Sequence, residues 1–418
     1  MARSVIGLPA VRSIIRENLD YPVLIVHQML KKKGYVIGRN TVGRYMRDLK
    51  KSDGIENKET QGEVEVEVDL VKMHQQRERE RQHKKELVEA VRENSFRTFI
   101  SDTIRENVLP MPPVSIVRPT KKSKTPNIRY PFLHFSDWHF EELVSLDATL
   151  GLNKYDIPTA CRRLWRVVQV IREWKKDLEY SGRFALPELV IGLNGDFLTG
   201  TLHGLERHSD APNVVRAALA CGDLIAMAIR DLASDFDRVK VYGVVGNHGR
   251  LPDSKKVPTK DPTRSWDFVA YQIAKRRLEH MPNIEFFLPD AYGVLFEVGG
   301  FWSYMAHGNF IPNNLGVVGY GVRRFTSSLA SNLQAVGKPL KYAFFGHWHS
   351  SQASEFAGVE AFIGPSLIGT QEYGFLSGGA VNRPSQELHL LDPELGHITR
   401  ERLYGEGPGY PGTYQVEI

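Results

Sequence analysis

The sequence contains little cysteine and no long hydrophobic run. Only Cys161 and Cys221 occur among its 418 residues, and both fall in segments whose periodicity predicts amphipathic helices. Two thiols placed in this way are a poor basis for a disulfide framework, so a reducing compartment is favoured. No window approaches about 18 consecutive apolar residues, and the N-terminus carries scattered arginines instead of the apolar core of a signal peptide. We therefore expect a cytoplasmic protein that is neither exported nor inserted in a membrane.

A strong surplus of one charge is also missing. The chain has 54 Lys and Arg against 49 Asp and Glu, a net charge of +5. This small excess is unevenly distributed, because the first fifty residues carry ten basic side chains and three acidic ones. Hydrophobic residues at 42% and charged residues at 25% exclude a disordered or fibrous chain, and the length predicts two or three domains.

Residues 1–55 are predicted to form a small helical domain. Apolar residues recur at three- and four-residue spacing, which predicts helices over residues 9–20, 22–33 and 41–51. Gly34 would stop the second helix, and Asn40 would cap the third. The basic residues expected on the outer face of the third helix include Arg39, Arg44, Arg47 and Lys50.

Two helices joined by a glycine-containing turn, the second of them basic, resemble a helix-turn-helix domain of the resolvase or winged type. The resemblance implies that the third helix enters a DNA major groove, with those four basic residues in contact with the DNA. The alternative is a three-helix unit that mediates only protein contacts.

Residues 56–108 differ in composition and read as a charged helical spacer. The alternation of acid and valine at 62–73 suits a short strand or wing, and residues 74–86 contain no aliphatic or aromatic side chain. Apolar residues up to 104 then restore a stripe that could dock on a partner or on the domain that follows. The segment is either a spacer or, over 74–105, a helix that joins subunits into a homo-oligomer. Residues 109–128 hold five prolines and form a linker.

From residue 129 to the end, segments typical of strands and helices alternate, which predicts an α/β domain. Five short polar clusters each follow an apolar run that reads as a strand. The residues of interest in these clusters are Asp137, His139, Asp196, Asn247, His248, His307, His347 and His349. Loops that leave the carboxyl ends of strands converge on one crevice in open α/β sheets, so we expect these side chains to meet.

The mixture of carboxylate, imidazole and amide donors indicates a metal centre. No cysteine lies near the clusters, which argues against a structural zinc site, and the donors suffice for two divalent ions that share a carboxylate. Glycines beside the clusters would let the backbone turn sharply and a phosphate approach closely.

Together the five clusters resemble the motifs of the calcineurin-like metallophosphoesterase superfamily, over about residues 130–405. The resemblance implies an α/β fold, a two-sheet β-sandwich flanked by helices, with two divalent metal ions, Mn²⁺ in the first place and Fe, Zn or Mg as alternatives. It implies that Asp196 bridges the ions. By the same resemblance the ligands of the first ion are Asp137, His139 and His349, and those of the second are Asn247, His307 and His347.

The resemblance also assigns a catalytic role to His248. A hydroxide activated by the two metals would attack phosphorus in line, while His248 protonates the leaving oxygen. Two positions depart from the pattern of the superfamily. Many members have an acid after the Asn-His pair, where this chain has Gly249, and the second motif lacks the further acid of the phosphoprotein phosphatases. The second departure argues against a protein phosphatase.

Residues around the motifs suggest the substrate. We expect His203 and Arg250 to contact it, and Tyr373 to stack on a base or ribose from a loop over the metals. The alternatives are solvated side chains at the first two positions and a plain hairpin connection around Tyr373. With a basic DNA-binding domain ahead of the catalytic one, the sequence predicts a DNA-directed phosphodiesterase, that is, a nuclease. The alternative is a phosphatase or cyclic-nucleotide phosphodiesterase with a small substrate, and a third reading is a DNA-binding scaffold whose phosphoesterase domain is inactive.

Overall fold

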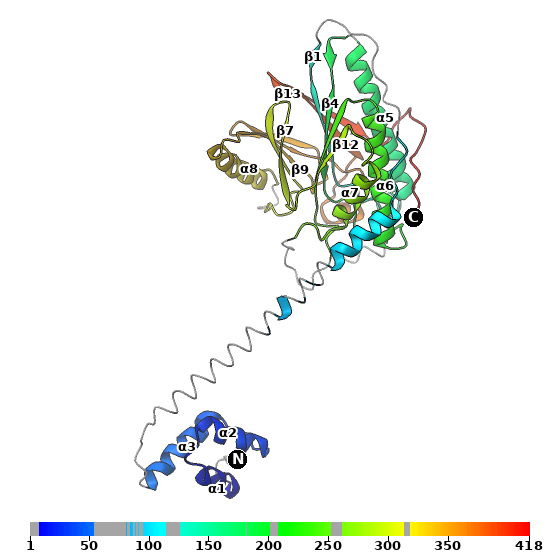
Figure 1. Ribbon diagram of the computed structural model, residues 1–418. Helices are drawn as coiled ribbons and strands as arrows, with labels where there is room; N and C mark the ends of the chain where they lie inside the picture. Colours follow the sequence, from blue (N-terminus) through cyan, green and yellow to red (C-terminus); the bar gives the residue numbers. More distant parts are fainter. Residues whose placement is uncertain are drawn as a thin grey trace. The chain divides into compact units, whose positions relative to one another are not determined.

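The computed structural model divides the chain into two compact units, Met1–Arg97 and Thr98–Ile418 (Figure 1). The described residues are 8–53, 81, 84–86, 88, 91, 95–113, 126–180, 182–200, 208–251, 261–312 and 318–418. The expected strand at 62–73, nearly all of the charged helix at 74–86, and His203 lie outside them.

Residues 8–53 of the first unit form three helices, each in contact with the other two. They are α1 (Pro9–Glu17), α2 (Val23–Lys32) and α3 (Arg39–Ser52). Their apolar faces form a small core that includes Val11, Ile15, Val26, Leu30 and Met46. These buried positions are the apolar residues whose helical spacing predicted the three helices, and all three helices are present.

The start of α3 differs from the prediction. The residue at its N-cap is Gly38, in an extended conformation with no side-chain cap, and Asn40 lies inside the first turn. The extended backbone at Gly38 lets the helix begin at Arg39, two residues before the expected start. Arg39, Arg44 and Arg47 are exposed, and Lys50 is half-buried.

The second unit begins with a helical segment at 98–107 that packs on the rest of the unit. Ile104 and Val108 belong to its main hydrophobic core, and Ile100 packs against that core. This fits the interpretation in which the apolar stripe docks on the domain that follows. Phe99 is 64% exposed and takes no part in that core.

One sheet has six strands in the order β13-β12-β2-β4-β5-β6. The strands β2, β4, β5 and β6 are parallel, and β12 and β13 add antiparallel pairs at one side. Their bounds are β2 Tyr130–Phe135, β4 Glu188–Asn194, β5 Arg238–Val244, β6 Ile284–Phe287, β12 Ser385–Asp392 and β13 Gly396–Tyr404.

The other sheet has five strands in the order β10-β11-β9-β8-β7. Its parallel pairs are β8 with β9 and β9 with β11, and the outer pairs are antiparallel. Their bounds are β7 Gly293–Val298, β8 Phe301–Ala306, β9 Leu340–Phe345, β10 Gln352–Phe356 and β11 Val359–Ile363. A short parallel pair is formed by β1 (Asn127–Ile128) and β3 (Phe184–Ala185).

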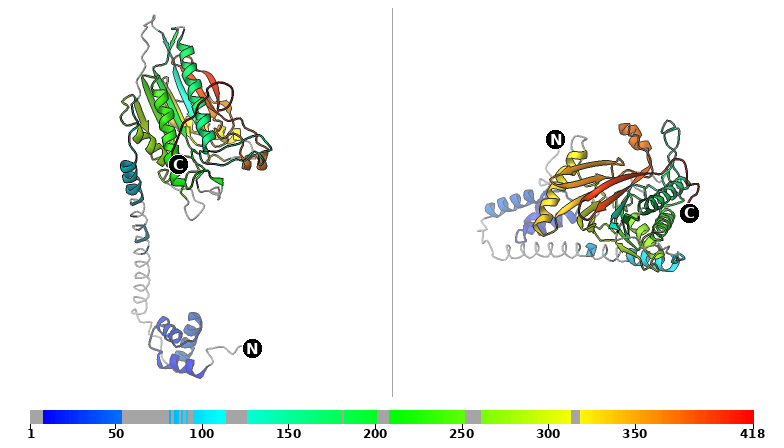
Figure 2. Two further views of the ribbon diagram at one scale, coloured as in Figure 1. Left: turned by 90° about the vertical axis from the view of Figure 1, so that its right-hand side faces the viewer. Right: turned by 90° about the horizontal axis from the view of Figure 1, so that it is seen from above.

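The two sheets pack face to face and are covered by helices. Phe132 and Val190 of the larger sheet share a buried cluster with Phe344 and Phe362 of the smaller one. Figures 1 and 2 show α5, α6 and α7 on one side of this sandwich and α8 on the other. The helices are α5 Ile157–Tyr180, α6 Val214–Ala233, α7 Trp266–Arg277, α8 Val318–Ala335 and the short α9 Glu372–Gly378. The predicted α/β fold is confirmed.

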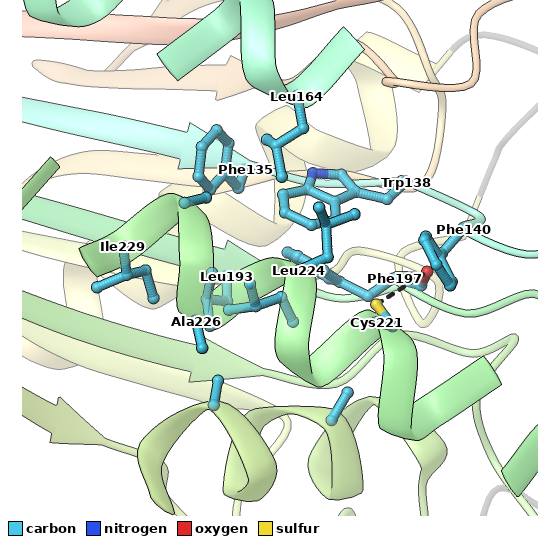
Figure 3. Packing of buried hydrophobic residues seen from close by; sticks show 14 of the residues in the cluster. Phe135, Trp138, Phe140, Leu164, Leu193, Phe197, Cys221, Leu224, Ala226 and Ile229 are labelled. Atoms are coloured by element: carbon cyan, nitrogen blue, oxygen red, sulfur yellow. Dashed lines mark hydrogen bonds between the residues drawn. The ribbon is translucent and has the colours of Figure 1, made fainter. Parts of the chain in front are cut away.

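The largest core lies between the six-stranded sheet and its helices (Figure 3). Leu164 of α5 and Leu224 of α6 pack there with Phe135 and Trp138. Both cysteines are buried and free, as expected, and Cys221 Sγ lies 3.9 Å from the carbonyl oxygen of Phe197. Among the described residues, no helix is both long and apolar enough to cross a membrane.

Candidate metal centre

The five polar clusters all follow directly on strands, namely β2, β4, β5, β8 and β9. Backbone hydrogen bonds join their loops. The N–H of Asp137 donates to the carbonyl of Gly195, and the N–H of His139 donates to the carbonyl of Asp196, both at 3.1 Å. The N–H of Gly346 donates to the carbonyl of His307 at 2.9 Å. The N–H of His347 donates to the carboxylate of Asp137 at 3.1 Å, so loops from both sheets meet at one place.

One group of potential ligands consists of Asp137, His139 and His349, whose ligand atoms lie within 4.8 Å of one another. His349 Nε2 is 3.2 Å from Asp137 Oδ1 and 3.2 Å from His139 Nε2. Asp137 and His139 are fully buried, and the side chain of His349 is 14% exposed. These are the three residues that the sequence assigns to the first metal.

A second group consists of Asp196, His307 and His347, again within 4.8 Å. His307 Nε2 lies 2.7 Å from Asp196 Oδ2, and both side chains are buried. Asp196 also forms a group with His139 and His248, so it lies between the two sets of ligands. A bridging carboxylate must occupy such a position.

Asn247 and His248 follow β5 at the same end of the sheet. The Oδ1 atom of Asn247 is buried and accepts no hydrogen bond from the described residues, which leaves its lone pairs available. The N–H of His248 donates to Asp196 Oδ1 at 2.8 Å, and its ring centroid lies 4.8 Å from that of His139. The structure thus brings all eight predicted catalytic and metal-binding residues to one end of the sandwich.

Five of these residues have left-handed backbone conformations, which residues other than glycine rarely adopt. They are Asp137 (φ 54°), His139 (φ 46°), Asp196 (φ 52°), His347 (φ 70°) and His349 (φ 54°). Each such residue costs about 1–3 kcal/mol and persists only where the surroundings hold it. Strain at five positions that all carry donor groups is typical of a functional site.

Two glycines make room for the carboxylates. A Cβ atom at Gly246 would lie 2.1 Å from Asp196 Oδ1, and one at Gly346 would lie 2.7 Å from Asp137 Oδ2. Neither position can hold a larger residue without a shift of the adjacent carboxylate. The predicted importance of glycines beside the clusters therefore has a steric cause.

Outer contacts orient two of the imidazoles. His307 Nδ1 lies 2.8 Å from the carbonyl oxygen of Asn194, which leaves Nε2 to face Asp196. His139 Nδ1 lies 3.1 Å from Thr199 Oγ1, and this hydroxyl donates to Glu142 Oε2 at 3.1 Å. Gln371 Nε2 donates to the same carboxylate oxygen at 2.8 Å. Contacts of this kind hold metal-binding histidines in one tautomer.

The electrostatics of the centre suit cations. Burial would raise the pKa of Asp137, but His349 and His307 lower it to about 2. Burial would lower the pKa of His307, but the charge of Asp196 raises it to about 9. Burial and the charge of His307 lower the pKa of His347 to about 4. Both carboxylates are thus ionised, and a cation that binds at His307 must displace its proton.

The donors fit two divalent ions. Each group supplies one carboxylate and two imidazoles, and Asn247 adds an amide oxygen with no other described partner. Mixed nitrogen and oxygen donors suit Mn²⁺, Fe²⁺ and Zn²⁺ and leave positions for water or substrate.

The predicted substrate residues have different outcomes. Arg250 lies beside Asn247 in the wall of a pocket, together with Arg264 and Tyr292. Tyr373 is 82% exposed and lies in the short helix α9, and its contact with the substrate stays a prediction. The preceding segment, 364–370, is buried and fixed, for instance by the N–H of Leu367, which donates to the carbonyl of Asp137 at 3.1 Å.

Sequence reasoning missed several supporting residues. Glu141 accepts hydrogen bonds from the N–H groups of Thr199 and Gly200. Gln386 accepts the N–H of Ser136 with Oε1 and donates to the carbonyl oxygen of Ser136 with Nε2. Asp267 accepts backbone N–H groups from the loop that carries Asp196. None of these residues lies in one of the five clusters. No local pattern of the sequence indicates that they are buried and support the site.

No protein family and no curated protein matches the sequence. Several solved structures are similar to this chain. A predicted phosphoesterase from Streptococcus pneumoniae is 12% identical, with 68% of this chain and 95% of that chain covered and a TM-score of 0.28. An archaeal phosphodiesterase is 11% identical, with 65% and 99% covered and a TM-score of 0.29.

A putative 5'-nucleotidase from Staphylococcus aureus is 13% identical, with 69% of this chain and 56% of that chain covered and a TM-score of 0.32. Likenesses of this strength are too weak to indicate the function of this chain. The site geometry must carry that argument.

Proposed function

We propose that the chain is a metal-dependent phosphoesterase of the calcineurin-like type that cleaves phosphodiester bonds in DNA. The observation that carries the proposal is the pair of buried ligand groups, Asp137/His139/His349 and Asp196/His307/His347, with Asp196 between them. Two ions at such a centre lower the pKa of water and neutralise the charge of a phosphoryl group.

His248 is the residue proposed to donate a proton to the leaving oxygen. Its backbone is held by the bond to Asp196 Oδ1, so the imidazole stays next to the ligands while remaining half-buried. An imidazole titrates near neutral pH and can donate a proton there. Asp267 lies next to the following residue, since a Cβ at Gly249 would be 3.0 Å from Asp267 Cγ. We propose that this absence of a side chain at position 249 accommodates Asp267, which supports the loop of His248.

The surroundings of Asn247 support a nucleic-acid substrate. The pocket there offers two guanidinium groups, from Arg250 and Arg264, and the ring of Tyr292. Guanidinium groups bind phosphate oxygens, and an aromatic ring can stack on a base. Both groups would also bind a single nucleotide, so this pocket equally favours the alternative of a small phosphate ester.

The first unit supports the choice of DNA. Its third helix exposes Arg44 and Arg47, whereas Val42 and Met46 of the same helix are buried in the small core. Gly43 allows α2 and α3 to approach closely, because a Cβ there would lie 3.2 Å from Val23 Cγ1. A tightly packed helix with an exposed basic face is the arrangement that DNA-binding helix pairs use. We propose that this unit binds DNA and raises its concentration at the catalytic unit.

The catalytic proposal is tested with purified protein and Mn²⁺ on linear duplex DNA, single-stranded DNA and bis(4-nitrophenyl) phosphate. We expect cleavage of DNA by the wild type, and a loss of at least about 100-fold in Asp196→Asn. His280→Gln, outside both ligand groups, is the matched control and should retain full activity. Hydrolysis of the nitrophenyl ester without DNA cleavage would support the small-substrate alternative, and no hydrolysis of any substrate with any metal would refute the enzyme.

The DNA-binding proposal is tested in the full-length chain. Arg44→Ala/Arg47→Ala removes two exposed charges from α3, and Lys31→Ala/Lys32→Ala removes two exposed charges from the end of α2. We expect the α3 variant to bind duplex DNA at least about tenfold more weakly and with a smaller salt dependence. Equal losses in both variants would point to a general charge effect, and no loss in either would exclude α3 as the contact.

A further inference from the structure

A further group of potential ligands lies away from the motif loops. It consists of His134 on β2 and of Glu387 and His389 on β12, and its ligand atoms lie within 4.8 Å of one another. The exposed fractions of the three residues are 1%, 0% and 0%. The centre proposed for catalysis uses none of them.

Strand pairing brings these residues together. In the antiparallel register of β2 and β12, Glu387 lies opposite His134, and His389 lies opposite Phe132. Alternate residues of a strand share a face, so all three side chains point to the same side of the sheet. That side is the interior of the sandwich, because the ring of His389 lies 5.1 Å from that of Phe344 and 4.6 Å from that of Phe362.

Each of the three residues has one atom bound to an outer partner. His134 Nε2 lies 2.9 Å from Asn194 Nδ2, and His389 Nδ1 lies 3.2 Å from His397 Nε2. Glu387 Oε1 accepts a hydrogen bond from Ser351 Oγ. These contacts fix the side chains in the way that outer contacts fix the ligands of a metal.

The other atom of each residue has no hydrogen-bond partner among the described residues. These atoms are His134 Nδ1, Glu387 Oε2 and His389 Nε2. The last two lie 3.5 Å apart. A buried polar atom without a partner costs about 1–3 kcal/mol, and more if it is charged. Glu387 Oε2 and His389 Nε2 are at ion-pair distance from each other, and one common cation would satisfy all three atoms, which lie among phenylalanine rings.

The protonation states are those that a metal requires. Burial and the proximity of His389 lower the pKa of His134 to about 4, so this ring is neutral near pH 7. Burial would raise the pKa of Glu387, but its contacts with His389 and Ser351 keep it below 4.5, so the carboxylate is ionised. Burial also lowers the pKa of His389, so this ring is neutral as well. Two neutral imidazoles and one carboxylate are a donor set that zinc accepts.

The amide of Asn194 can set the tautomer of His134. Its Oδ1 has no hydrogen-bond partner in the described part of the chain. A half-turn of the amide group would place Oδ1 next to His134 Nε2, where it accepts the proton of that nitrogen. The lone pair of His134 is then on Nδ1, the atom that faces the group.

We propose that His134, Glu387 and His389 bind a divalent transition metal ion, best matched by Zn²⁺, inside the sandwich. The ion joins β2 to β12 and stabilises the folded chain. Its ligands are buried between the sheets, so it has no direct access to a phosphate ester. Asn194 connects it to the catalytic centre, because its carbonyl oxygen lies 2.8 Å from His307 Nδ1.

The metal content of the full-length protein tests this proposal. After growth and dialysis with Zn²⁺, elemental analysis should find one ion per chain fewer in His389→Gln than in the wild type. His280→Gln, the control, should match the wild type. Asp196→Asn should lose metal from the catalytic centre. The double variant Asp196→Asn/His389→Gln should contain one ion fewer than Asp196→Asn. The comparison therefore distinguishes loss of metal at one centre from loss at the other.

A second measurement covers the case in which His389→Gln does not fold. Crystals of the wild-type protein with Zn²⁺ should show anomalous scattering from zinc within bonding distance of His134, Glu387 and His389. No zinc signal at that position would overturn the proposal, whether or not His389→Gln folds. The group would then be a hydrogen-bonded cluster with a protonated histidine.

Discussion

Asp267 Oδ2 accepts the backbone N–H of Asp196 at 3.0 Å. The same oxygen accepts the N–H of Gly246 at 2.9 Å, and Oδ1 accepts the N–H groups of Phe197 and Leu198. One fully buried carboxylate on α7 therefore holds the loops after β4 and β5 together. Because Asp196 has a left-handed backbone, these bonds also hold the strained conformation in place.

We expect Asp267→Asn to weaken both the fold and the metal centre. In the variant an NH₂ group replaces one of the two carboxylate oxygens and cannot accept a hydrogen bond. The backbone N–H groups that donate to that oxygen would then have no acceptor. The free energy of unfolding should fall by about 2–4 kcal/mol, and Mn²⁺ affinity by about 10- to 100-fold. Urea unfolding and calorimetric titration measure these changes.

The matched control is Asp237→Asn, at an exposed position just before β5. It should change neither quantity. Unchanged stability and Mn²⁺ affinity in Asp267→Asn would show that this carboxylate does not support the centre.

Gly246→Ala should damage the centre for a steric reason. The added Cβ would lie 2.1 Å from Asp196 Oδ1 and 2.5 Å from Asp196 N, so the carboxylate must move. A displacement of about 1 Å lowers catalytic rates about 100-fold, and we expect at least this loss in hydrolysis of bis(4-nitrophenyl) phosphate. Gly319→Ala in α8 is the control, since no described atom lies within 4 Å of its Cβ. Similar rates for both variants would contradict the steric argument.

The sequence predicts those parts of the molecule that local patterns determine. Helical spacing locates α1 and α2, and apolar runs followed by polar clusters locate the strands and the ligands at their ends. The site is predictable because residues such as Asp196 and His307 must follow parallel strands whose ends meet.

Long-range contacts account for most of what the sequence does not predict. Asp267 lies 71 residues from Asp196, and His134 is about 250 residues from Glu387. No local spacing relates such residues, because strand order and register bring them together. The wrong cap at Asn40 has a different cause, since the backbone conformation of a short connection depends on the packing of the elements that it joins.

His248→Asn should separate proton donation from metal binding. We expect DNA cleavage to fall by about 100- to 10,000-fold, since an alkoxide leaving group needs a proton. Hydrolysis of bis(4-nitrophenyl) phosphate should fall by less than about tenfold, because nitrophenolate leaves without one. Metal content should stay at the wild-type value. Equal losses on both substrates, or loss of a metal ion, would indicate that His248 acts as a ligand.

Asp156 should stabilise α5 in a pH-dependent manner. Its Oδ1 accepts the N–H of Thr159 at 2.8 Å, an N-terminal cap. Burial alone would raise its pKa, but the hydrogen bonds from Thr159 and the charge of Lys154 lower it below 3.8. A carboxyl whose pKa is lower in the folded state stabilises the fold above its unfolded pKa, and this contribution is lost as the pH falls through the folded value.

Asp156→Ala should therefore lower the free energy of unfolding by about 1 kcal/mol at pH 7, and the difference from wild type should shrink as the pH falls below about 4. Asp147→Ala, at an exposed position in the preceding loop, should show no such difference at either pH. Urea unfolding at a series of pH values measures both. A protonated carboxyl can no longer act as an anionic acceptor for the N–H groups of the first turn. A difference that persists unchanged at pH 3 would therefore mean that the cap does not depend on the charge of Asp156.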